Sequence, residues 1–528
     1  MSGIVYRPDG ASRRKILQLF GATGAFLTLP LGDGAALAQA VFRTNPFTLG
    51  IAAGDPWPDG FVIWTRLAPE PLEFGSGMPH RNVEVDWQVA ADQNFATIVR
   101  SGKAMARPEL GHSVHVEVAG LEPARVYWYR FTVGGERSQT GRAKTAPAAG
   151  APVSHVRLGV AGCQNYEAGF FTAYRKLAAE DLDFIYCYGD YIYEGRGSLT
   201  RNGPNGIEDA LRTHIGDEPY SLDDYRRRYA QYKLDKDLQA AHASAAWFNV
   251  WDDHETDNNW ASKDDQDDTP PEVFALRRQA SAQAYYENMP LRSTAIPRGT
   301  SIQIYRRAAY GDLINLNLLD TRQFRTHQPC TKGENPCVLD APDGQIMGSA
   351  QEQWLVDGMT SSKAKWNVIA QQVMMMDLDR DPGPGYRANT DSWGGYRASR
   401  TRFLSALRDR KVGNVVVLTG DEHVNYAGEV HIDSRSPGPA PIGIEFLGTS
   451  VTSGGDGVDQ SANSVALLGA NPSLKFINNQ RGYLVCDVTP QRWQTDFKVL
   501  DKVSDHQGVL TTRTKLAVEA GTPRIVPA

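Results

Sequence analysis

Short runs of alternating apolar and polar residues fill the N-terminal part of the chain. The clearest are residues 61–65, 83–89, 113–118 and 126–133, and turn-forming residues such as Gly134-Gly135 separate them. A period of two, interrupted by turns, is typical of antiparallel strands with one buried face. We therefore expect a small β-sandwich over residues 41–147, followed by a linker rich in Pro and Ala at 146–152.

After residue 153 the pattern changes to longer apolar runs with helical segments between them. Residues 156–162 and 182–188 read as buried strands that end in glycine, and the segment 170–180 has helical spacing. This order predicts a βαβ unit. Further helices are predicted at 225–233 and 275–289, and further strands at 313–319, 366–373 and 414–418. We expect one α/β domain over residues 153–528, with ligand sites at the carboxyl ends of its strands.

Composition narrows the class of protein. The 528 residues include 55 Lys and Arg against 61 Asp and Glu, a formal net charge of −6. This mild acidity argues against a nucleic-acid-binding module. A hydrophobic content of 41% is that of an ordinary globular chain and argues against disorder. No feature of the sequence signals association, so we expect a monomer.

Residues 1–40 have the layout of an export signal. Arg13-Arg14 precedes an apolar stretch, and Ala36-Leu37-Ala38-Gln39-Ala40 offers small residues for cleavage. The paired arginines predict twin-arginine export to the periplasm or the medium. A membrane anchor is the alternative, but the apolar stretch is shorter than the ~20 residues of a span and contains Gly and Thr. No later segment is expected to cross a membrane.

The chain has five cysteines, and two of them lie close together in sequence. Outside the cytosol, Cys330 and Cys337 are expected to close a small loop as a disulfide. The alternative is two unpaired surface thiols, which are uncommon in exported proteins. The odd count leaves at least one thiol for another role.

Three predicted strand ends are rich in carboxylate, imidazole and amide groups. They are Gly189-Asp190-Tyr191-Ile192-Tyr193-Glu194, Trp251-Asp252-Asp253-His254-Glu255 and Gly420-Asp421-Glu422-His423-Val424-Asn425. Carboxylates neutralise the charge of a metal ion, and histidine serves as a ligand or as a general acid. One such cluster is weak evidence, since strand-end Asp residues often cap helices. Three in one domain predict a metal site.

Taken in order, these motifs resemble the calcineurin-like metallophosphoesterase plan, and more specifically the alkaline phosphatase D (PhoD-type) family. The likeness covers nearly the whole chain and includes Leu319-Asp320-Thr321-Arg322-Gln323 and the run 366–373. It implies a four-layer αββα metallophosphoesterase domain behind a fibronectin-III-like β-sandwich. It also implies an exported enzyme that hydrolyses phosphate monoesters and diesters with iron, Fe(3+), and calcium, Ca(2+).

The resemblance assigns an iron site to the first strand ends. Cys163 stands where the wider superfamily carries Asp-x-His, and a thiolate is a softer, anionic ligand that suits iron. Tyr193 follows Asp190 by three residues, and a phenolate favours ferric iron. Cys163, Asp190, Tyr193 and His423 are therefore the expected Fe(III) ligands. The alternative for Cys163 is a small buried residue without function.

The second metal is expected to prefer calcium. Asp421 stands where the superfamily places histidine, and Gln371 or Gln372 lies near another such position. Oxygen ligands in place of imidazole favour calcium over zinc or manganese. Asp190 would bridge the two metals. Asp253 is preferred to Asp252 by register with the family motif, and Gln372 is chosen over Gln371 without a decisive reason.

The expected reaction is in-line attack on phosphorus by a metal-bound hydroxide. His254 is the predicted general acid for the leaving alcohol, and its alternative is a structural histidine. Arg322 is predicted to bind phosphate, with an ion pair to Asp320 as an equal alternative. A phospholipase D-type phosphodiesterase in the same scaffold is the second hypothesis. A non-catalytic binding protein is the third, and the intact set of ligands argues against it.

Overall fold

The computed structural model describes residues 42, 44–203, 206–331, 337–381, 383, 385–434 and 440–528, without the side chains of 201–208. The predicted export signal at 1–40 lies outside the described residues. Within the described part, no helix combines the length and the apolar character needed to cross a membrane. Residues 42–528 form one compact unit.

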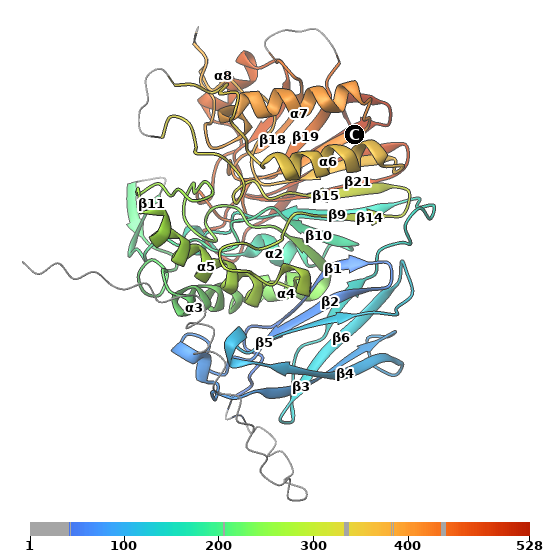
Figure 1. The fold of residues 1–528 in the computed structure, drawn as a ribbon, viewed down its shortest axis with the longest axis vertical. Coiled ribbons are helices and arrows are strands. Elements are labelled where there is room, and N and C mark those ends of the chain that lie inside the picture. The colour runs from blue at the N-terminus through green and yellow to red at the C-terminus, as the bar shows by residue number, and fades with distance from the viewer. Residues whose placement is uncertain are drawn as a thin grey trace, which may run out of the picture. The chain divides into compact units, whose positions relative to one another are not determined.

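Two large β-sheets form the frame of this unit (Figure 1). The first sheet has the order β24 (Thr522–Pro527), β23 (Leu510–Glu519), β22 (Arg492–Leu500), β21 (Gly482–Val488), β9 (Val156–Ala161), β10 (Phe184–Cys187), β13 (Ala246–Asn249), β1 (Ile51–Trp57), β2 (Gly60–Arg66) and β5 (Ser113–Val118). Its central strands β9, β10, β13 and β1 run parallel. Their carboxyl ends therefore meet at one edge.

The second sheet repeats this plan with fewer strands. Its order is β14 (Arg306–Tyr310), β15 (Ile314–Leu318), β16 (Trp366–Ala370), β17 (Val415–Thr419), β19 (Gly443–Leu447), β18 (Asn425–Val430) and β20 (Leu474–Asn478). The strands β15, β16, β17 and β19 are parallel. A separate antiparallel sheet joins β4 (Ile98–Ala106), β3 (Val83–Ala90), β6 (Val126–Val133), β7 (Glu136–Arg137) and β8 (Gly141–Lys144), and β11 (Thr200–Gly203) pairs with β12 (Gly206–Asp209).

Helices cover the outer faces of the sheets. They are α2 (Thr172–Leu177), α3 (Leu222–Lys233), α4 (Lys236–Ser244), α5 (Pro271–Asn288), α6 (Ser349–Ser361), α7 (Arg397–Asp409) and α8 (Ala462–Ala470). Short 3₁₀ turns occur at Phe74–Gly77, Pro108–Leu110, Tyr166–Ala168, Ser293–Ala295 and Trp393–Gly395. Ser221 and Asp224 form a capping box at the start of α3, and Asp235 caps α4.

Alternation along the strands separates two cores. In β17, Val416 and Leu418 join the core that also contains residues of the first sheet. Val415 and Val417, on the opposite face, join the core that contains Phe403 and other residues of α6 and α7. The two sheets therefore pack against each other with helices outside, which is a mixed α/β fold as predicted from the sequence.

The N-terminal segment is more closely joined to the rest than its sequence indicated. Strand β1 pairs in parallel with β13, placing Ala53 opposite Ala246 and Gly54 opposite Trp247. The expected sandwich at 41–147 and the expected domain at 153–528 thus share one continuous sheet. Residues 51–56 are all buried, as in a strand covered on both faces. The likeness of this segment to fibronectin type III stays a prediction.

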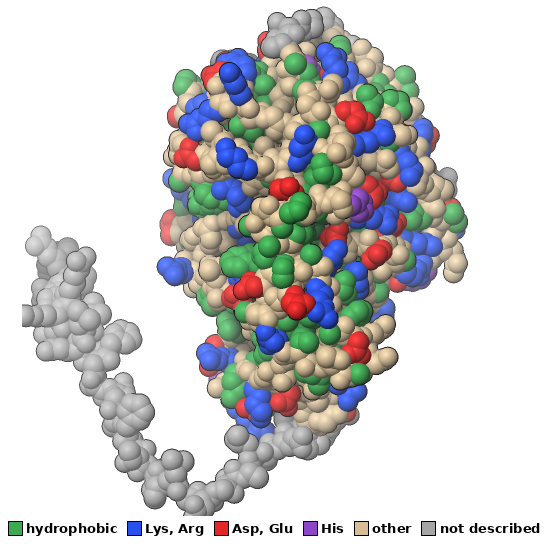
Figure 2. Space-filling model, turned by 90° about the vertical axis from the view of Figure 1, so that its right-hand side faces the viewer, with side chains coloured by type: hydrophobic (Ala, Val, Ile, Leu, Met, Phe, Trp, Pro, Cys, Tyr) green, Lys and Arg blue, Asp and Glu red, His purple; other side chains and the backbone are tan. Residues whose placement is uncertain are grey.

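The pairing of the cysteines agrees with the sequence-based prediction. Cys330 and Cys337 form a disulfide, as predicted, and Cys163, Cys187 and Cys486 are buried free thiols. On the face seen in Figure 2, basic and acidic side chains are interspersed.

Candidate metal centre

Polar side chains from four strand ends meet at the carboxyl edges of the two sheets. They follow β9, β10, β13 and β17 in the chain. Three overlapping groups have ligand atoms within 4.8 Å of one another: Cys163, Asp190 and His423; Asp190, Asp253 and His254; and Asp252, Asp253 and Asp421. Asp190 links the first group to the second, and Asp253 links the second to the third. The arrangement suits two neighbouring ions that share a carboxylate.

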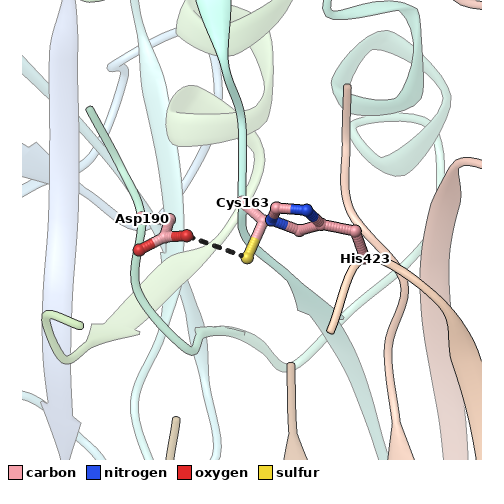
Figure 3. A group of neighbouring side chains, drawn as sticks. All are labelled: Cys163, Asp190 and His423. Atoms are coloured by element: carbon pink, nitrogen blue, oxygen red, sulfur yellow. Dashed lines mark hydrogen bonds between the residues drawn. The ribbon is translucent and has the colours of Figure 1, made fainter. Parts of the chain in front are cut away.

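The first group contains three of the four residues predicted to bind iron, Cys163, Asp190 and His423 (Figure 3), and Tyr193 lies beside them. Cys163 Sγ lies 3.3 Å from Asp190 Oδ2, and Tyr193 Oη lies 2.8 Å from the same oxygen. His423 Nε2 is 3.1 Å from Tyr193 Oη. Cys163, Asp190 and Tyr193 are buried, whereas His423 is half-buried. A thiol, a phenol, a carboxyl and an imidazole thus converge on one small volume.

Four of the candidate ligands adopt a backbone conformation that side chains other than glycine rarely take. The φ angles are 51° at Cys163, 54° at Asp190, 68° at Asp421 and 55° at His423. Left-handed residues of this kind carry strain and gather at functional sites. Here the left-handed turn lets each chain segment leave its strand abruptly, and the side chain at the turn faces the centre.

Glycines precede three of these ligands, and Tyr188 requires two of them. A Cβ at Gly162 would lie 2.4 Å from Tyr188 Cε2, and a Cβ at Gly420 would lie 2.1 Å from the same atom. The Tyr188 hydroxyl donates to Thr449 O at 2.5 Å. The ring of Tyr188 therefore fills the space between the ends of β9 and β17, directly behind Cys163 and Asp421.

We expect Gly420→Ala to weaken both folding and the metal centre. The new methyl group must displace the Tyr188 ring, and overpacking of this kind costs about 1–3 kcal/mol. Chemical denaturation and metal content measure the two effects. Gly413→Ala is the matched control, because its Cβ meets nothing within 4 Å. A Gly420→Ala protein as stable and as metal-rich as the control would contradict this explanation of the strand ends.

The third group gives Asp252 and Asp253 different surroundings. Asp252 Oδ1 accepts from Arg322 Nε at 2.5 Å, so this carboxylate is already paired. Asp253 Oδ2 accepts from the backbone N–H of Asn259 at 2.7 Å, while its Oδ1 is buried without a hydrogen-bond partner and lies 3.7 Å from Arg322 Nη2. Asp190 Oδ1 is also buried and unpartnered. Asp253 therefore stays the predicted ligand, and Asp252 belongs to the same group.

Both glutamines of the predicted calcium site are buried and bonded to neighbours. Gln372 Oε1 accepts from Thr321 Oγ1 at 2.8 Å, and its amide donates to Leu319 O. Gln371 Oε1 accepts from Val373 N at 3.2 Å. Neither oxygen is among the unpartnered buried oxygens of the site. Gln372 therefore stays a prediction.

Arg322 is fully buried and bonded to carboxylates. Its Nε reaches Asp252, and its two terminal nitrogens bind Asp391 at 2.8 and 2.7 Å. Asp320, the expected partner, instead accepts from the Arg322 backbone N–H. The geometry favours the ion-pair alternative, with different partners, over phosphate binding. Arg322 offsets part of the negative charge of the third group, and Asp391 is a residue that the sequence analysis missed.

His254 is bonded to Glu194, a residue to which the sequence analysis assigned no role. His254 Nδ1 lies 2.6 Å from Glu194 Oε2, and Glu194 Oε1 accepts from Asn258 N at 2.8 Å. The imidazole packs over Tyr193, with ring centroids 4.1 Å apart. Burial opposes the imidazolium, but Glu194, Asp253 and Asp190 outweigh it and raise the pKa of His254 well above its usual value. Because Nδ1 is occupied, Nε2 is the nitrogen left to meet a substrate.

The pKa values of the candidate ligands favour the binding of cations. Burial, reinforced by neighbouring carboxylates, raises the pKa values of Asp190 and Asp421 well above the ordinary range. Burial, and next the charge of Arg481, lower the pKa of His423 to about 3, so its imidazole is neutral and has a lone pair to give. A metal ion reverses the cost of such crowded carboxylates. With the unpartnered oxygens of Asp190 and Asp253, the donor set fits bound metal ions.

Known proteins match this chain along most of its length. The PhoD-like phosphatase family matches residues 158–497, and its N-terminal domain matches residues 34–147. Alkaline phosphatase D of Bacillus subtilis (strain 168) is 44% identical over 517 residues, covering 96% of this chain and 87% of that protein.

Solved structures agree with the sequence match. A structure of PhoD superposes with a TM-score of 0.89 at 43% identity and covers 93% of each chain. A purple acid phosphatase from yellow lupin (Lupinus luteus) seeds has a TM-score of 0.50 at 12% identity, covering 89% of this chain and 73% of its own, and shares the fold alone. The chain therefore belongs to the PhoD-like phosphatase family and is a phosphoric ester hydrolase.

Proposed function

We propose that this chain is an exported, metal-dependent phosphatase that cleaves both phosphate monoesters and diesters, with ferric iron beside Cys163 and calcium beside Asp253. The observation that carries the proposal is the convergence of Cys163, Asp190, Tyr193 and His423 next to the carboxylates of Asp253 and Asp421. Thiolate and phenolate suit iron, and an oxygen-only set suits calcium. Family membership supports phosphoester hydrolysis.

Bound metal ions would supply Lewis acidity, which activates water and neutralises charge on phosphorus oxygens. The protein side chains divide the remaining work. Cys163, Tyr193 and His423 would hold the first ion, Asp253 and Asp421 the second, and Asp190 would bridge them. Asn259 steadies Asp253, and Arg322 with Asp391 steadies Asp252. His254 Nε2 would give its proton to the leaving alcohol while Glu194 holds Nδ1.

We expect Glu194→Gln to lower kcat without loss of metal. The amide still fills the space, but it no longer fixes the protonated His254 ring through a charged acceptor. Orientation supplies a part of the ~10²–10⁴-fold effect of a general acid, so the fall should be smaller than that for loss of His254 itself. Steady-state kinetics and elemental analysis on one preparation test this. A Glu194→Gln enzyme with unchanged kcat would remove Glu194 from the account.

Two finer features of the proposal need separate tests. A comparison of rates on bis-nitrophenyl and mono-nitrophenyl phosphate distinguishes a phosphatase from a phospholipase D-type phosphodiesterase, since the two share their chemistry and differ in the pocket. Export through Arg13-Arg14 would be lost when both residues are replaced by lysine, with the protein then retained in the cytoplasm. Size-exclusion chromatography with light scattering tests the expected monomer.

A further inference from the structure

A buried arginine without a carboxylate partner lies behind the candidate metal centre. Arg481 precedes β21 and is 4% exposed. Its Nη1 donates to His423 O at 2.5 Å, Ser453 O at 2.6 Å and Ser450 Oγ at 2.8 Å. Its Nη2 donates to Asn479 O. In the part of the chain that the structure describes, no carboxylate forms an ion pair with this guanidinium.

This arrangement leaves the buried guanidinium without an ion pair among the described residues. A buried charge is costly unless it is paired, and the arginines at the other side of the centre follow that rule. Arg322 and Arg325 both bind Asp391. Arg481 instead donates to backbone carbonyls and one hydroxyl, and its Nε is buried without a hydrogen-bond partner. The guanidinium of Arg481 therefore fixes the backbone of its neighbours rather than neutralising a carboxylate.

Arg481 is bonded directly to one member of the first metal group, His423, and to a residue that contacts two further candidate ligands. His423 is one of the left-handed ligands, and the guanidinium grips its carbonyl directly. Ser453 carries the second connection, because its Oγ lies 2.8 Å from Cys163 O and 2.6 Å from Tyr193 Oη. Arg481 therefore touches one ligand and reaches two more through a single residue.

The segment between these contacts is pinned along its length. Val451 N donates to Gly162 O at 3.0 Å, and Thr452 Oγ1 donates to Asn165 O at 2.7 Å. The loop that carries Ser453 thus lies against the strand end that presents Cys163. Arg481 also binds this loop, through Ser450 Oγ and the carbonyl oxygen of Ser453.

We propose that Arg481 is a positioning residue of the metal centre: by holding the carbonyls of His423 and Ser453 it keeps Cys163, Tyr193 and His423 converged on one ion. The inference rests on the proposed function, since it requires that a metal binds there. It assigns no contact with substrate to Arg481. Its effect is on metal affinity, because residues that orient ligands typically change that affinity by ~10–100-fold.

The chain offers a matched control in Arg400. This arginine of α7 is also 4% exposed and donates to three backbone carbonyls, those of Met375, His431 and Ile432, at 2.6, 2.6 and 3.0 Å. Like Arg481, it has no carboxylate ion pair among the described residues. It holds none of the candidate ligands. Replacing either arginine removes a similar set of buried contacts, so a difference in metal binding isolates position from general loss of stability.

The experiment measures metal retention in wild type, Arg481→Gln, Arg481→Lys and Arg400→Gln. Each full-length mature protein is dialysed against increasing chelator, and bound iron and calcium are determined by elemental analysis beside a circular dichroism spectrum. We expect both Arg481 variants to lose iron at a chelator concentration at least roughly tenfold lower than the wild type requires. Arg400→Gln should retain iron as the wild type does. Lysine should not rescue, because one ammonium cannot span the same carbonyls.

Ser453→Ala keeps the inference testable if the Arg481 variants do not fold. It removes only the hydroxyl that links the loop to Tyr193 and Cys163, and it should weaken iron retention in the same direction. Wild-type retention in folded Arg481→Gln or in Ser453→Ala would overturn the positioning role while leaving the proposed function intact. A wild-type protein that binds no metal would overturn both.

Discussion

Replacement of Asp190 by asparagine should remove nearly all phosphoester hydrolysis together with the bound metal. Asp190 belongs to two of the three metal groups, and its Oδ2 already lies against Cys163 and Tyr193. Its Oδ1 is buried and unpartnered. The amide keeps the shape but loses the negative charge between two cations. Metal-assisted stabilisation amounts to several kcal/mol, so kcat should fall by ~10³-fold or more.

Asp55→Asn is the control for this variant. Asp55 is also buried and carries one ion pair, with Arg306, but it belongs to none of the metal groups. Its loss should reduce stability and leave metal content and kcat per folded molecule near wild type. Kinetics and elemental analysis on both variants decide the matter. An Asp190→Asn enzyme that keeps both ions, or more than a tenth of its activity, would be incompatible with a bridging role.

Replacement of His254 by asparagine should give the complementary result, a large loss of rate with the metals in place. His254 Nδ1 lies 2.6 Å from Glu194 Oε2, which leaves Nε2 as the proton donor. General acid catalysis contributes ~10²–10⁴-fold, and the benefit is greatest where the alcohol leaves poorly. The fall in kcat should therefore be steep for alkyl phosphates and shallow for nitrophenyl phosphate.

The leaving-group series is the strict part of that prediction. Measuring His254→Asn and wild type on esters of graded alcohol pKa gives two slopes, and the variant should show the steeper dependence. Equal losses across the series would mean that His254 acts in some other way. Loss of iron or calcium in the variant would make it a ligand or a structural residue and would end its assignment as the acid.

The clustering of the candidate ligands was largely predictable because its signals are local. A strand, a glycine and a polar side chain stand next to one another in the chain at Cys163, Asp190 and Asp421. Parallel strands then bring such ends to one edge without further information. Glu194 stands in the same strand-end motif as Asp190 and Tyr193. Its role could also have been predicted, because a carboxylate at that position can bind any histidine that the fold brings near.

The remaining features depend on contacts between distant parts of the sequence. Nothing near Ala53 indicates that it pairs with Ala246, so the sheet shared by both predicted domains stayed hidden. The bonds of Arg322 to Asp252 and Asp391 were not predicted, because these partners lie 70 and 69 residues away in the sequence. Arg481 carries no sequence signal at all, because its partners are backbone carbonyls.

Metal analysis of the purified protein, with a visible spectrum and a phosphoester assay on the same sample, is the decisive test of the proposed iron and calcium sites. The account predicts iron and calcium together in each chain, a broad visible band from tyrosinate bound to ferric iron, and loss of hydrolysis when the metals are removed. Zinc or manganese without iron would refute the roles of Cys163 and Tyr193. Full hydrolysis by a folded, metal-free protein would contradict the account as a whole.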